Sequence, residues 1–130
     1  MSHIRKDDEL PLATAGWGWK FHHLGIPTEG PIPGEQHYAR LGIYVGGFYD
    51  SPYGVEWMRF EPSCRVHDLV RKVPHLAFVV DDMEKAVEGK ELLGEVNSPS
   101  PGLKVAMIVH NGAPIELMEF SARRRPKRGK

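Results

Sequence analysis

The 130-residue sequence predicts an α+β domain made of two related modules, and three observations support this fold class. An apolar, strand-like segment that contains histidine occurs twice, at residues 22–26 and again at 75–79. A second strand-like segment, with the pattern apolar-Glu-apolar-Met-x-Phe, also occurs twice, at 55–60 and 115–120. A helical pattern follows the second histidine segment. Because both segment types recur in the same order, we interpret the chain as a duplicated module.

The composition indicates one cytoplasmic domain. A chain of this length can bury its own core, and its 17 basic and 17 acidic residues cancel, so no overall field attracts nucleic acid or a membrane. Cys64 is the single cysteine, which excludes an intrachain disulfide and fits a reducing compartment. No apolar run reaches the length of a membrane span. We therefore expect a cytoplasmic protein with no nucleic-acid partner and no membrane partner.

The two ends of the chain are expected to lie outside the repeated unit. Residues 1–16 show no periodicity and predict an irregular lead-in. Residues 17–121 form the single expected domain. Residues 122–130 combine arginine and lysine with one proline, one glycine and no apolar face, which predicts a disordered basic tail.

The first module, residues 20–62, is expected to have a degraded helix. Prolines and glycines at 28–36 exclude a regular helix there, so the helix is missing or reduced to a turn around 35–40. The expected elements are, in order, a strand at 20–27, the irregular segment at 28–36, a strand at 41–49, a turn at 50–54 and a strand at 55–60.

In the second module, residues 74–120, a helix is expected after the histidine strand. Asp81 or Asp82 begins it, since Asp81 with Glu84 fits a capping box, and an apolar stripe continues it to about residue 90. A Pro- and Ser-rich segment predicts a loop. The other expected features are the connector at 62–72, a strand at 74–80, the loop at 97–102, and a closing hairpin with strands at 105–109 and 115–120.

Strand alternation places four polar side chains on one side of the sheet. Successive residues point to opposite faces, so Glu56 and Glu116 each share a face with the Met and Phe that follow them. His75 belongs to the same kind of face, and His23 is expected to share its face with Phe21. A carboxylate on a mostly apolar face is costly unless it is paired or bound to a metal. Two imidazoles and two carboxylates suit a divalent first-row metal, namely Zn, Ni, Mn or Fe(II).

The alternate residues of the two histidine strands are apolar and point the other way. They include Leu24, Ile26, Leu76, Phe78 and Val80. We expect them to face the layer in which the helix packs.

Three motifs resemble the vicinal oxygen chelate superfamily, which includes glyoxalase I, bleomycin- and fosfomycin-resistance proteins, methylmalonyl-CoA epimerase and extradiol dioxygenases. The motifs are residues 23–26 (HLGI), residues 75–82 (HLAFVVDD) with the following helix, and residues 115–117 (IEL). The similarity covers residues 20–120. It implies two βαβββ modules that form a curved mixed sheet around a metal-binding cavity, here with the helix of module one degraded.

The resemblance also implies which residues bind the metal and act on a substrate. Carried over, the ligand positions are His23, Glu56, His75 and Glu116, a two-His, two-Glu set that is similar to that of glyoxalase I. Glu56 or Glu116 would take a proton next to a carbonyl and return it to the neighbouring carbon, with the metal as a Lewis acid. The function expected is therefore a glyoxalase-like, metal-dependent isomerase or lyase that acts on a small oxygenated substrate by proton transfer.

Several alternatives remain open, because one fold supports many reactions. The chain could be an Fe(II) dioxygenase-type enzyme, or a metal-free small-molecule binding or resistance protein. His22 could replace His23 as the ligand, because the choice depends on strand register. Members of the family usually pair, so a homodimer is expected, with each site formed by one chain or shared between two.

Overall fold

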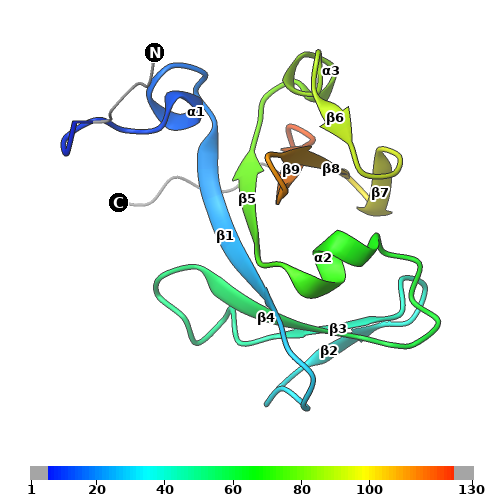
Figure 1. The fold of residues 1–130 in the computed structure, drawn as a ribbon. Helices are drawn as coiled ribbons and strands as arrows, with labels where there is room; N and C mark the ends of the chain where they lie inside the picture. Colours follow the sequence, from blue (N-terminus) through cyan, green and yellow to red (C-terminus); the bar gives the residue numbers. More distant parts are fainter. Residues whose placement is uncertain (1–5, 125–130) are drawn as a thin grey trace.

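The computed structural model describes residues 6–124, and its strands form one curved mixed sheet accompanied by short helices (Figure 1). This arrangement confirms the predicted α+β class. The strand order across the sheet is β2-β3-β4-β1-β5-β9-β8-β6, and β7 pairs with β8. The strands are β1 (Lys20–Pro27), β2 (Gln36–Tyr38), β3 (Ile43–Gly46), β4 (Val55–Phe60), β5 (His75–Val79), β6 (Glu91–Leu92), β7 (Asn97–Ser100), β8 (Leu103–His110) and β9 (Ala113–Phe120). The helices are α1 (Leu12–Ala15), α2 (Asp68–Lys72) and α3 (Met83–Ala86).

The two central strands, β1 and β5, join the modules. They pair antiparallel with each other. On its other side each pairs in parallel with the last strand of its own module, β1 with β4 and β5 with β9. The chain therefore extends in similar fashion from both sides of the β1–β5 pair, with β4 and β3 on one side and β9 and β8 on the other (Figure 1).

The strand register repeats between the modules at the residues that matter for the site. Gly25 pairs with Glu56 across β1 and β4, and Ala77 pairs with Glu116 across β5 and β9. Each of these small residues also pairs with the histidine of the other module across β1 and β5. In both modules the histidine stands two positions before the small residue that pairs with the glutamate: His23 before Gly25, and His75 before Ala77. This shared register is the physical basis of the repeat in the sequence.

The core of the second module lies between the sheet and α3. The cap of α3 is Asp82, whose carboxylate accepts the Lys85 N–H at 3.3 Å. The helix has four residues, so the prediction of a helix to about residue 90 is wrong in length; turns follow, and Gly89 leaves the helical path with a φ of +70°. The buried cluster comprises Phe78, Val80, Met83, Ala86, Ala106, Ile108 and Leu117, with Trp19 packed against it.

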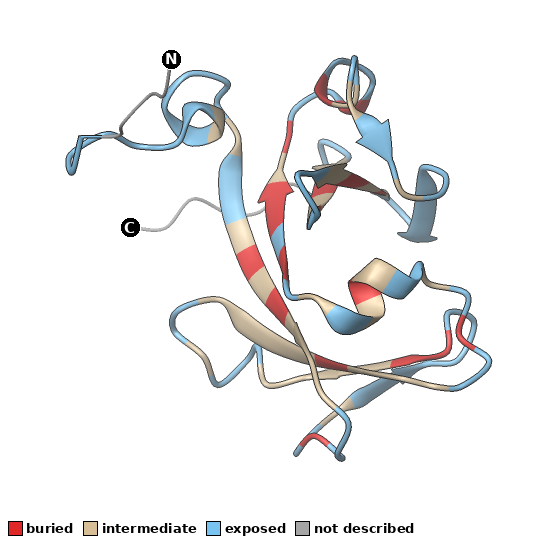
Figure 2. Ribbon diagram, viewed as in Figure 1, coloured by how far each residue is buried: buried red, intermediate tan, exposed pale blue. Residues whose placement is uncertain are grey.

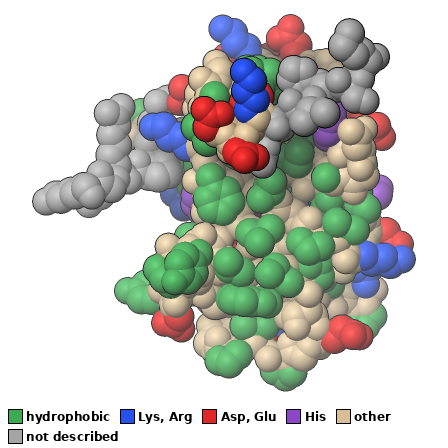
Figure 3. Space-filling model, turned by 60° about the vertical axis from the view of Figure 1, so that its left-hand side comes forward, with side chains coloured by type: hydrophobic (Ala, Val, Ile, Leu, Met, Phe, Trp, Pro, Cys, Tyr) green, Lys and Arg blue, Asp and Glu red, His purple; other side chains and the backbone are tan. Residues whose placement is uncertain are grey.

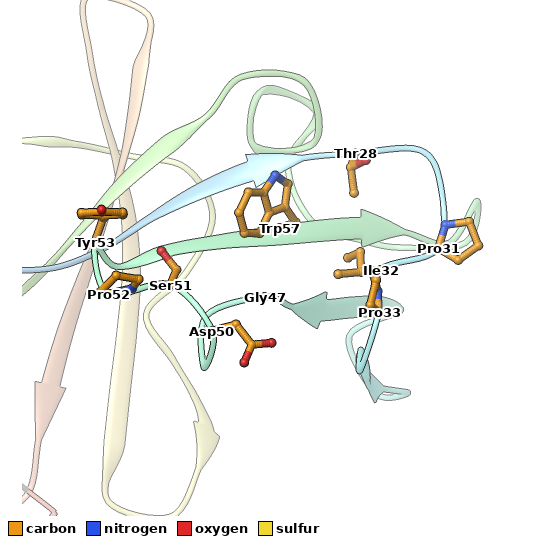
Figure 4. Close-up of a pocket in the computed structure, with 10 residues that line it drawn as sticks. All are labelled: Thr28, Pro31, Ile32, Pro33, Gly47, Asp50, Ser51, Pro52, Tyr53 and Trp57. Atoms are coloured by element: carbon orange, nitrogen blue, oxygen red, sulfur yellow. The ribbon is translucent and has the colours of Figure 1, made fainter.

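In the first module an irregular loop stands where the second module has α3. Among the described residues, those from 28 to 35 form no helix, which confirms the predicted degraded helix. The loop leaves a cavity of about 580 Å³ beside Trp57 (Figure 4). Trp57 is the counterpart of the fully buried Leu117, because each directly follows its module's glutamate. By alternation this cavity lies on the opposite side of β4 from Glu56.

Short elements occur where the sequence predicted irregular chain. α1 lies in the lead-in, β2 in the expected turn at 35–40, α2 in the connector and β7 in the expected loop at 97–102. These elements have three to five residues, too few to show a periodic pattern. The expected strand at 41–49 is also shorter, because Gly47 turns the chain with a φ of +87°.

A β-bulge in β1 changes the orientation of Phe21. Phe21 pairs with Phe78, whereas His23 pairs with Ala77, so the extra residue, His22, has no partner of its own in β5. Since directly paired residues point to the same face, Phe21 lies with Phe78 on the outer side of the sheet, away from His23. The expectation that Phe21 and His23 share a face was therefore wrong.

Burial on the outer side of the sheet is uneven, and in Figure 2 the mostly buried β5 carries an exposed band. Phe78 and Val80 are buried against α3, as expected, but Leu76 is 42% exposed and Phe21 is 47% exposed. The expected helix layer therefore covers the second module and not the centre of the sheet.

Hydrophobic side chains gather on the side of the molecule seen in Figure 3, with charged groups mainly at its margins.

Two predictions concern the ends and the membrane. Of the expected disordered tail at 122–130, residues 122–124 form a turn, in which Arg124 donates hydrogen bonds at 2.7 Å to the Ser100 hydroxyl and the Pro101 carbonyl. Residues 125–130, and residues 1–5 of the lead-in, lie outside the described part of the chain. In residues 6–124 no helix is long and apolar enough to cross a membrane.

We predict that Leu117→Ala lowers the free energy of unfolding by about 2–5 kcal/mol, because it removes a fully buried side chain and leaves a cavity in the core cluster. The matched control, Leu76→Ala, removes the same atoms from a side chain that is 42% exposed and should cost clearly less. Urea denaturation of the two variants measures both changes. Equal losses would contradict the uneven covering of the sheet.

Candidate metal centre

Four side chains from β1, β4, β5 and β9 converge on the inner side of the sheet. Nε2 of His23 lies 3.2 Å from Oε1 of Glu56 and 3.3 Å from Oε1 of Glu116. Nε2 of His75 lies 3.0 Å from the same oxygen of Glu116. The structure therefore brings together all four residues that the sequence singled out, although their role as ligands stays a prediction.

The register explains why these residues meet. His23 and His75 come from adjacent antiparallel strands, and each glutamate is one strand further out, on the same face. Both imidazoles are buried, and the carboxylate side chains of Glu56 and Glu116 are 17% and 15% exposed. The group is thus largely removed from water, which strengthens every electrostatic interaction within it.

The spacing of the nitrogen and oxygen atoms suits a metal ion. One ligand atom from each of His23, His75 and Glu116 can be chosen so that all lie within 4.8 Å of one another. Ligands bound at about 2.0–2.2 Å around a small divalent ion are themselves roughly 3.0–3.5 Å apart. The distances of 3.0 and 3.3 Å from Glu116 to the two imidazoles match this spacing. Glu56 adjoins the group through His23.

The hydrogen bonding of the His23 imidazole is incomplete at Nε2, the atom that faces the other three side chains. Its Nε2 atom is buried and has no hydrogen-bond partner of good geometry among the described residues. Two carboxylate oxygens nevertheless lie within 3.3 Å of it. A buried polar atom without a hydrogen bond is uncommon and needs an explanation. Atoms that point at a shared position, and not directly at each other, fit a site built for a cation.

Electrostatics separate the two carboxylates. Burial raises the pKa of Glu116, but the hydrogen bond with His75 and the close approach and positive charge of both His23 and His75 outweigh burial and lower the pKa to about 2. The pKa of Glu56 is raised, chiefly by burial, with a further contribution from the negative charge of Glu116. Glu116 is therefore the more permanent anion, and Glu56 is the better proton acceptor.

The charge state of His23 reflects the same contacts. Burial lowers the pKa of His23, but its interactions with Glu116 and Glu56 outweigh burial and raise the pKa above its ordinary value. The carboxylates thus favour positive charge at this position. A metal cation placed there would meet the same attraction.

His22 is a residue whose place the sequence analysis missed. It was considered there as a substitute for His23, but the bulge brings both rings to the inner side together. The two Nδ1 atoms lie 2.7 Å apart. The His22 ring stacks on the Phe48 ring, with 5.7 Å between the ring centroids, and its centroid lies 6.2 Å from that of Phe120. The His-His pair was a visible signal, but regular alternation assigns the two rings to opposite faces.

Gly25 is a second such residue. A Cβ atom at this position would lie 2.2 Å from Cε1 of His75, and 2.7 and 2.8 Å from its two ring nitrogens. The His75 ring therefore lies directly over the backbone of β1, in space that only glycine leaves free. A glycine in a strand can signal such close approach, but the sequence does not say which side chain approaches.

Comparisons with known proteins bear on the fold. No protein-family description matches the sequence, and no curated protein matches it. The structure is similar to the crystal structure of methylmalonyl-CoA epimerase from Mycobacterium tuberculosis, with a TM-score of 0.55 and 18% identity over 80% of this chain and 89% of that chain. A hypothetical protein from Bacillus halodurans C-125 gives a TM-score of 0.46 and 13% identity over 92% of this chain and 86% of that one.

The likeness to the epimerase concerns a member of the superfamily that the motifs resemble, and it covers most of both chains. Together with the two-module sheet, it shows that this chain has the vicinal oxygen chelate fold.

We predict that Gly25→Ala destabilises the protein and disturbs the site, because the added methyl group would overlap the ring of His75. The expected loss is about 1–3 kcal/mol of unfolding free energy, together with weaker metal binding. The matched control is Gly30→Ala, since a Cβ atom there would meet nothing within 4 Å. Denaturation and metal titration of both variants test this, and wild-type behaviour of Gly25→Ala would contradict the close packing.

Proposed function

We propose that this protein is a metal-dependent isomerase or lyase that moves a proton on a small oxygenated substrate, in the manner expected of a glyoxalase-like enzyme. The main support is the group formed by His23, His75 and Glu116, whose ligand atoms all lie within 4.8 Å of one another. Imidazole and carboxylate ligands suit Zn, Ni, Mn or Fe(II). The structure of similar fold is, by its name, an epimerase, and an epimerase is an isomerase.

The three residues of this group would hold the ion. The low pKa of Glu116 favours its remaining a carboxylate, and both imidazoles point Nε2 toward it. Glu56, next to His23, would complete the set. A divalent ion bound here would supply Lewis-acid stabilisation of negative charge on the substrate oxygens.

Glu56 is the proposed base. Its raised pKa makes it a stronger proton acceptor than an ordinary carboxylate, while it stays close enough to the site to act there. It would take a proton from the carbon next to the substrate carbonyl and return it to the neighbouring carbon.

Metal content tests the proposal. We expect about one divalent ion per chain in untagged protein, lost in His75→Ala and in Glu116→Ala, with ions measured by elemental analysis after removal of chelators. The matched control is His110→Ala, because His110 is exposed at the end of β8, away from the group. No ion in the wild type, and none taken up from added Zn, Ni, Mn or Fe(II), would contradict the proposal and favour a metal-free binding protein.

The same loaded proteins test the role of Glu56. Glu56→Gln should slow deuterium exchange next to the carbonyl of small oxygenated probe compounds by about 10²–10⁴-fold, because it removes the base. Glu61→Gln is the control, since Glu61 pairs with His37 and not with the site. Unchanged metal affinity together with unchanged exchange in Glu56→Gln would overturn the four-residue mechanism. Oxygen-dependent turnover with bound iron would instead favour the dioxygenase alternative.

A further inference from the structure

The strand that carries His23 presents two neighbouring histidines to the inner side of the sheet. The bulge between Phe21 and His23 makes this possible, because a bulged strand places two residues against one partner. The Nδ1 atoms of His22 and His23 lie 2.7 Å apart, and the rings are nearly perpendicular at 79°. Nε2 of His23 points the other way, toward Glu56 and Glu116.

Metal binding at Nε2 would decide where the hydrogen of His23 lies, and so the direction of its hydrogen bond with His22. A neutral imidazole has one N–H and one lone pair. If the lone pair of Nε2 faces the metal, the hydrogen must be on Nδ1. Nδ1 of His23 then donates to Nδ1 of His22, which accepts through its own lone pair.

The ring of His22 is itself held in position. It lies parallel to Phe48, with an interplanar angle of 4°, and is tilted 31° against Phe120. These rings come from the segment after β3 and from the end of β9. The acceptor for His23 is thus fixed by contacts from both modules.

His75 has no comparable partner. Its Nδ1 atom is buried and has no hydrogen-bond partner among the described residues. Its ring is instead confined by the backbone at Gly25. The two imidazoles of the candidate centre are therefore oriented by different means, one by a hydrogen bond and the other by packing.

We propose that His22 is a positioning residue for metal binding: its Nδ1 accepts a hydrogen bond from Nδ1 of His23 and thereby directs Nε2 of His23 at the ion. The inference rests on the proposed function, because it concerns the same site. Metal-bound histidines usually donate this hydrogen bond to a carboxylate, a backbone carbonyl or water. Here a second histidine takes that part.

Three substitutions separate the hydrogen bond from the packing. His22→Asn can place an amide oxygen near the position of Nδ1 and should keep a zinc affinity close to that of the wild type. His22→Gln carries its amide further out, and His22→Phe keeps a ring against Phe48 but has no acceptor. Both should bind Zn²⁺ about 10–100-fold more weakly, as losses of such partners typically do. Competition with a chromogenic chelator measures the affinities, and circular dichroism checks the fold.

The tautomers provide a second readout that packing alone would not change. In ¹⁵N-labelled, zinc-loaded wild-type protein, long-range ¹H–¹⁵N spectra should show hydrogen on Nδ1 of His23 and none on Nδ1 of His22. A hydrogen on Nδ1 of His22, or zinc on Nδ1 of His23, would overturn the inference.

The outcomes also distinguish this inference from the proposed function. Wild-type affinity in His22→Phe, with affinity lost in His75→Ala, would overturn the role of His22 and leave the metal centre intact. If the wild type binds no metal, both fall together.

Discussion

The convergence of two imidazoles and two carboxylates on the inner side of the sheet is the constraint on which the rest of the structure depends. Charged groups removed from water are costly unless they are paired. Here the pairing is incomplete, because Nε2 of His23 lies near two carboxylates without a well-formed hydrogen bond to either. The antiparallel β1–β5 pair and the parallel strands beside it hold these atoms in place. The proposed cation would complete their interactions.

The two modules differ in what covers the sheet behind the glutamate of the site. In the second module α3 covers the sheet behind Glu116, and Leu117 is fully buried. In the first a proline-rich loop replaces the helix, and Trp57 borders a cavity. The surroundings of the two imidazoles also differ, since His23 contacts His22 and His75 packs over Gly25. The duplication thus fixes where the four side chains meet, while the two histidines are oriented by different contacts, each of which involves residues of both modules.

The repeated His and Glu segments were enough to predict the duplicated fold and the four residues that meet. The position of each His or Glu within its strand determines, by alternation, which face of the sheet the side chain points to. The bulge at His22 could not be predicted, because it depends on how β1 pairs with a strand some fifty residues later, at Phe78 and Ala77. The short β7 and α2 depend on tertiary contacts and not on local periodicity. The uncovered Leu76 reflects where α3 ends.

A crystal structure of the protein loaded with Zn²⁺, with diffraction measured on both sides of the zinc absorption edge, tests the proposed metal centre most directly. We expect one strong anomalous peak in contact with Nε2 of His23, Nε2 of His75 and a carboxylate oxygen of Glu116, at about 2.0–2.2 Å from each. An anomalous peak elsewhere in the chain, with these three atoms still in contact with one another and with no ion between them, would contradict it.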